Sequence, residues 1–64
     1  MTYQEARQAL KTRASVKVNG TNYKHINAII FRKTDKIELI QVELQDMNNN
    51  NSVTIARLEQ VECI

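Results

Sequence analysis

Apolar and polar residues alternate along most of the chain from residue 14 to its end. Val16 and Val18 are separated by a polar neighbour, and the same period of two returns in the middle of the chain and again near its end. A period of two is typical of strands that bury one face. We therefore predict five strands, over residues 14–18, 22–33, 37–45, 52–57 and 61–64.

The first residues follow a helical period instead. Tyr3, Ala6 and Leu10 recur at spacings of three and four, which places them on one stripe of a helix over residues 3–12. Thr2 and Glu5 have the spacing of a capping box. Because so short a helix does not persist alone, we expect its apolar stripe to pack on the sheet.

Four sites along the chain predict turns or irregularities. Asn19-Gly20 is a strong signal for a two-residue hairpin turn of type I′. The apolar phase slips after Tyr23, which predicts a bulge or bend near residues 25–27, and it slips again between residues 39 and 40. The four asparagines of residues 48–51 predict a mobile loop.

Together these elements indicate a mainly β fold: a small five-stranded barrel or bent meander with one short N-terminal helix. The segment VTIARLEQV, residues 53–61, combines a strand, one turn of tight helix and the start of a last strand. Because of the pattern in this segment, residues 14–64 resemble the SH3-like small β-barrel. The resemblance implies a shape and no inherited activity, because the chain has no Trp and no Pro and lacks the glycine pattern of ribosomal and transcription-factor barrels.

The chain length and the single cysteine indicate how stable the protein is and in which redox environment it folds. Sixty-four residues make one domain of marginal stability, which favours a partner subunit or docking to another protein. Cys63 is the only cysteine, so no internal disulfide can form, and we expect it to be a small core residue of a reduced, cytoplasmic protein. The longest apolar run, residues 28–31, is far shorter than the roughly 20 residues of a membrane helix.

Charge is distributed unevenly, although the net charge is only +2. Residues 1–36 hold eight Lys or Arg against two acidic residues, whereas residues 37–64 hold one Arg against five acidic residues, which gives +6 and −4. Such a split can provide a basic binding face or let copies pair head to tail. It can also mean only that the two halves interleave and neutralise one another.

The chain offers little catalytic or metal-binding chemistry. His25 is the only imidazole and Cys63 the only thiol, and no ligand-type residues have metal spacing. A Cys–His nucleophile pair is conceivable if the fold brings the two together, but a strand histidine beside a bend and a small apolar cysteine explain them better. We therefore predict a protein that is not an enzyme and holds no cofactor.

Protein binding is the function that the pattern favours. The second and third predicted strands are apolar on both faces, and one small helix cannot cover both, so an exposed patch is expected that would mark an interface. We predict that Ile29, Phe31 and Leu39 contribute to it, with another protein or a second copy as the partner and a homodimer as a sufficient explanation. The small size and the Ile- and Asn-rich composition resemble accessory proteins of bacteriophages and prophages, which implies an accessory protein or an inhibitor of a host protein.

Nucleic-acid binding is the alternative. Small barrels can bind a strand across one sheet face with basic and aromatic side chains, and the candidates here are Lys17, Lys24, Arg32 and Lys33 with Tyr23. The pI near 8.9 and the low net charge give this hypothesis a weak electrostatic basis.

Overall fold

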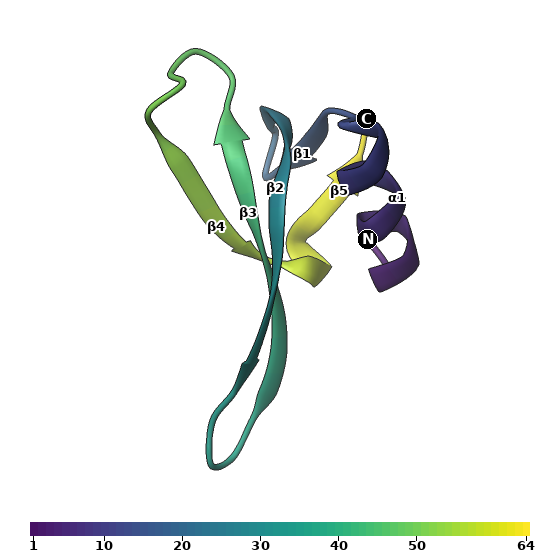
Figure 1. Ribbon diagram of the computed structural model, residues 1–64, viewed down its shortest axis with the longest axis vertical. Coiled ribbons are helices and arrows are strands. Elements are labelled where there is room, and N and C mark those ends of the chain that lie inside the picture. Colours follow the sequence, from purple (N-terminus) through teal and green to yellow (C-terminus); the bar gives the residue numbers. More distant parts are fainter.

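The protein consists of one five-stranded antiparallel sheet and one α-helix (Figure 1). The structure is a computed structural model that describes all 64 residues. Its elements, in chain order, are α1 (Tyr3–Thr12), β1 (Val16–Val18), β2 (Thr21–Lys33), β3 (Glu38–Asp46), β4 (Val53–Arg57), the 3-10 helix η1 (Leu58–Gln60) and β5 (Val61–Cys63). The mainly β fold and the helix over residues 3–12 are confirmed, and the strand ends differ from the prediction by at most two residues.

A complete capping box begins α1. The Glu5 N–H donates to the Thr2 hydroxyl at 3.1 Å, and the Thr2 N–H donates to Glu5 Oε1 at 2.8 Å. The hydrogen bond from the Thr2 backbone, followed by that of its side chain, lowers the pKa of Glu5. The helix ends at Arg13, which adopts a left-handed conformation with φ of 58°.

The buried side of α1 is made of small residues. Ala6 and Ala9 are buried, and Leu10 is half-buried against the core. Tyr3 packs on the sheet outside the core. It lies at the N-terminal end of α1, is exposed, and meets the ring of Phe31 edge-on with a centroid distance of 5.5 Å.

The predicted turn and bulge are both present. Asn19 and Gly20 have φ values of 49° and 81°, so both central residues of the β1–β2 turn lie in the left-handed region that a type I′ turn requires. In β2, the register with β3 shifts twice, so that Lys24 and Asn27 have no residue opposite them. The apolar phase slip between residues 39 and 40 produces no bulge. The register is regular between residues 38 and 42, and Leu39 lies on the face opposite to Ile40.

The sheet has the strand order β4-β3-β2-β1-β5. Strands β4 and β5 are neighbours in the sequence, joined by the single turn of η1, yet they lie at the two ends of the sheet (Figure 1). They are not hydrogen-bonded to each other. The sheet is therefore a bent meander with two free edges, and not a barrel closed by hydrogen bonds.

The core is small and entirely apolar. Its ten residues come from the helix, from η1 and from all five strands: Ala6, Ala9, Val16, Val18, Ile26, Val42, Leu44, Ala56, Leu58 and Val61. One expectation about the core was wrong. Cys63 is exposed, although it lies opposite the buried Val16, because β5 is an edge strand with no further strand beside it.

Beyond this core, the β2–β3 hairpin continues as a projecting arm, residues 31–40 (Figure 1). In this arm the two strands pair only with each other, since β1 and β4 pair with other parts of the hairpin. No residue of the arm is buried. The molecule is accordingly elongated, at 36 × 23 × 21 Å, and its surface of 4607 Å² exceeds the roughly 4200 Å² of a compact monomer of this mass.

Candidate protein-binding groove

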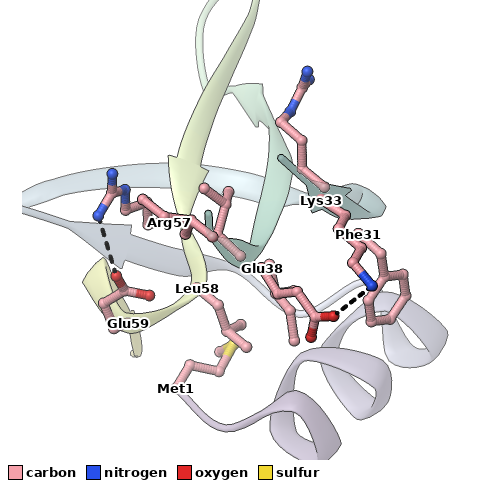
Figure 2. Close-up of a pocket in the computed structure, with 11 residues that line it drawn as sticks. Met1, Phe31, Lys33, Glu38, Arg57, Leu58 and Glu59 are labelled. Carbon is pink, nitrogen blue, oxygen red and sulfur yellow. Dashed lines mark ion pairs between the residues drawn. The ribbon is translucent and has the colours of Figure 1, made fainter. Parts of the chain in front are cut away.

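A groove of about 710 Å³ lies between the arm and the corner where β4 meets η1 (Figure 2). Its apolar lining residues are Met1, Phe31, Ile37, Leu39, Ile40 and Leu58. This volume is within the 300–1,000 Å³ typical of sites that bind small molecules or inserted side chains. The groove is open to solvent on one side, so it can accept a projecting side chain from another molecule.

Two ion pairs line the rim of the groove. Lys33 Nζ lies 3.2 Å from Glu38 Oε1, and Arg57 lies 3.9 Å from Glu59. In Figure 2, Met1 and Leu58 lie between these two pairs. All four side chains are largely exposed, so each pair adds little to stability. Together the pairs surround the apolar floor with charges that are already partnered.

Arg32 lies on the other face of the arm, with its cross-strand partner Leu39. Its Nε donates to Gln41 Oε1 at 2.9 Å on that face. The charges on the Phe31 side of the groove are therefore the two ion pairs, which balance one another.

Phe31 is the most exposed apolar residue of the groove. Its side chain is 65% exposed, although it lies on the same face of the sheet as its cross-strand partner Ile40. Tyr3 contacts the Phe31 ring edge-on and is itself stacked under the guanidinium of Arg7, 5.7 Å from the ring centroid. These contacts position Phe31 without burying it. Full burial of an exposed Phe side chain by a partner contributes about 1.5–3 kcal/mol to the free energy of binding.

Of the three predicted interface residues, two border the groove, from opposite faces of the arm. Phe31 lies on the face of Ile40, and Leu39 lies on the other face. Ile29 does not border the groove: it lies opposite the buried Val42 and packs against the core. The bulge at Asn27 sets this arrangement, because it determines which face of β2 each later residue occupies.

The groove also contains residues that the pattern analysis did not select. Met1 and Leu58 are far from the arm in the sequence, and Ile37 lies in the turn between β2 and β3. The Met1 amino group donates to the Val61 carbonyl at 2.8 Å, which holds Met1 over the groove. No local sequence signal connects these positions, because their proximity depends on how η1 folds back toward the arm.

The residues considered for nucleic-acid binding are spread over the molecule. Arg32 and Lys33 lie on the arm, whereas Lys24 lies eight residues earlier in β2, about 26 Å along an extended strand. Lys17 is on β1 opposite Asn22, which is two residues before Lys24, and Tyr23 is half-buried against the core. Lys17 and Lys24 therefore lie near each other, and both are far from Arg32 and Lys33 on the arm.

His25 and Cys63 are also apart. Cys63 lies opposite Val16 in β1, which in turn lies opposite Tyr23 in β2. Two strand spacings, about 10 Å, therefore separate Cys63 from the strand that carries His25, beyond hydrogen-bond reach. The His25 ring instead accepts from Arg13 at Nε2, over 3.0 Å, because a guanidinium can only donate. Its Nδ1 is buried without a partner.

No group of three or more His, Cys, Asp or Glu side chains lies close enough together to hold a metal ion. Neither α1 nor η1 is long and apolar enough to cross a membrane. Comparison of the chain with protein-family models, with curated proteins and with solved structures gives no match.

Proposed function

We propose that this protein is a non-enzymatic protein-binding module that uses the groove between the arm and η1. The observation that carries the proposal is that apolar side chains of the arm, of η1 and of Met1 gather around one open groove, with Phe31 exposed at 65%. An exposed aromatic side chain beside aliphatic ones is typical of an interface. Phe31 would act as the aromatic anchor of the contact, since aromatic residues dominate interface energies.

The groove selects a partner of defined chemistry. Its floor is apolar, and its rim charges form two ion pairs. The matching ligand is a segment of another protein that presents apolar side chains without a charged neighbour. Such a groove would be sufficient for an accessory or inhibitory protein that acts on another protein by surface contact alone.

A capture experiment with matched variants tests the proposal. We expect the tagged wild-type protein to retain one protein in stoichiometric amount, and Phe31→Asp to lose it, because the substitution places a charge in the apolar contact. Phe31 is exposed, so the variant should keep its fold, as circular dichroism would verify. Met47→Asp is the control, since Met47 is exposed at 43% and does not line the groove.

A second measurement addresses the ligand class directly. Two synthetic peptides, one with two adjacent leucines and one with aspartates in their place, would be titrated into labelled protein. We expect the leucine peptide to bind more tightly and to shift the amide signals of the arm and η1. Equal capture by Phe31→Asp and wild type, or shifts confined to other regions, would contradict the groove as the binding site.

A further inference from the structure

Strand β4 pairs with β3 on one side only and forms the outer border of the sheet (Figure 1). Monomeric proteins protect an edge by keeping it very short or by placing Lys or Pro on it. The five residues of β4 read VTIAR, which is an ordinary strand length, and their one charge is at the end, on Arg57. Val53 and Ile55 are each 46% exposed. The edge of β4 is therefore open to another strand.

The opposite edge of the sheet, β5, is protected. It has only three residues. The Val61 N–H donates to the Leu58 carbonyl, and the Val61 carbonyl accepts from the amino group of Met1. Because a very short strand with occupied backbone groups offers little to a partner, β4 is the edge that can extend the sheet.

The register identifies the free backbone groups of β4. The Asp46 N–H donates to the Ser52 carbonyl, so these two opposite residues form a bonded pair just before the first residue of β4. Bonded and non-bonded pairs alternate in an antiparallel ladder. Thr54 therefore bonds to β3, while Val53 and Ile55 direct their N–H and carbonyl groups away from it.

Side chains of the protein itself occupy an N–H group at each end of this edge. The Arg57 N–H donates to Gln60 Oε1 at 3.1 Å. In the turn before β4, the Asn51 N–H donates to Asn49 Oδ1 at 2.9 Å. Residues 51 and 57 are equally far from residue 54, so the free N–H groups, those of residues 53 and 55, form a window that is symmetric about Thr54.

An antiparallel second copy of β4 matches this window when the Thr54 residues of the two chains lie opposite each other. Each Val53 then lies opposite Ile55 of the other copy, and each such pair exchanges two N–H to carbonyl bonds. A two-fold axis at Ile55 would instead place Val53 opposite Arg57, whose N–H is already bonded. An axis at Val53 would place Ile55 opposite Asn51, whose N–H is also bonded. The register centred on Thr54 is the one that satisfies the free N–H groups and breaks no existing bond.

The same register matches the side chains. Val53 and Ile55 lie on the face of the sheet opposite to the buried Ala56, because successive residues of a strand alternate. In a dimer each Val53 packs against Ile55 of the other copy, and cross-strand contacts of this kind stabilise a sheet. Arg57 lies opposite the neutral Asn51, so no like charges meet. A second copy provides by symmetry the spacing of free groups and apolar side chains that a foreign strand would have to match.

We propose that two copies of this chain form a two-fold dimer by antiparallel pairing of β4 with β4, with Thr54 at the axis. The contact uses the same surface of both copies, so it closes at the dimer. It joins the five strands of each copy into one continuous sheet of ten. Because the contact is small, the dimer forms in a concentration-dependent manner. The pairing does not use Phe31.

Light scattering over a range of concentrations tests the dimer, with a reductant present so that the exposed Cys63 forms no disulfide. We expect the mass of wild type to rise with concentration toward twice the 7.4 kDa of one chain. Ile55→Lys should weaken the dimer by about tenfold or more, since it places a charge in both Val53–Ile55 contacts. Ile64→Lys is the matched control, because Ile64 is 68% exposed and follows β5 at the other edge.

Cysteine cross-linking tests the register, in a Cys63→Ser background. We expect Thr54→Cys to give a disulfide-linked dimer on mild oxidation, because the Cα atoms of a non-bonded antiparallel pair lie about 4.5 Å apart. Ile55→Cys should not link, since the two copies of this position are offset by two residues, about 7 Å along the strands.

Three results would overturn the proposal: wild type that stays monomeric at all concentrations, equal dimerisation of wild type and Ile55→Lys, and linkage through Ile55→Cys but not Thr54→Cys. If Ile55→Lys does not fold, as circular dichroism would show, Val53→Lys places the same charge on this edge. Phe31→Asp should dimerise like wild type, so that loss of groove binding and loss of dimerisation are measured separately.

Discussion

The two ends of the β2–β3 hairpin have the same kind of sequence and opposite environments. Near the bulges, Ile26 and Leu44 face each other and are fully buried beneath α1 and among the other strands. In the arm, Phe31 and Ile40 also face each other, yet neither is buried. The difference lies in the neighbours, since the arm has no strand on either side and meets α1 only at Tyr3. Stability therefore resides at one end of the hairpin and binding surface at the other.

The largest expected effect comes from a cavity at the buried end. Leu44→Ala removes a side chain with no exposed surface and should lower the free energy of unfolding by about 2–5 kcal/mol. In a domain of this size, such a loss can be most of the total stability. Phe31→Ala in the arm is the matched comparison, and it should cost well under half as much in urea denaturation. Equal losses would mean that the arm contributes to the core.

A smaller effect is expected at the cap of α1, which covers the buried end. Thr2→Ala removes the hydroxyl that accepts from Glu5 and should cost about 1 kcal/mol. The reciprocal bond of the capping box, from the Thr2 N–H to Glu5 Oε1, makes stability depend on pH. The pKa of Glu5 is lowered in the folded state, so its contribution is present above the ordinary pKa of glutamate and is lost as the pH falls through the lowered value.

Thermal melts of wild type and Glu5→Gln between neutral and acidic pH would detect this dependence, because the glutamine side chain does not titrate. We expect the difference between the two proteins to shrink as the pH falls. A constant difference across that range would show that the Glu5 carboxylate does not contribute to the cap.

The smallest effect is expected in the arm itself. The pair of Lys33 and Glu38 is exposed on both sides, at 78% and 76%, so a double-mutant cycle with Lys33→Ala and Glu38→Ala should give a coupling of about 0–1 kcal/mol. The coupling should fall further in high salt. A coupling above that range would mean that the pair fixes the shape of the arm and not only the rim of the groove.

Local signals in the sequence predicted the local structure well. The capping box, the Asn19-Gly20 turn and the phase slip in β2 each depend on residues within a few positions, and each is present. Burial was harder to predict because it depends on distant elements. Cys63 continues the apolar pattern of Val61 but lies on an edge strand, and the groove combines Met1 and Leu58 with the arm.

The extra residue at Asn27 makes β2 tolerant of a change in chain length. Asn27 has no residue opposite it in β3, and its side chain donates to Gln45 at 3.1 Å. Loss of this single residue from a gene would remove the bulge and leave the other pairs in register, so Ile26 would still lie opposite Leu44 and Phe31 opposite Ile40. The bulge is therefore a place where β2 can lose one codon while the arm keeps both of its faces.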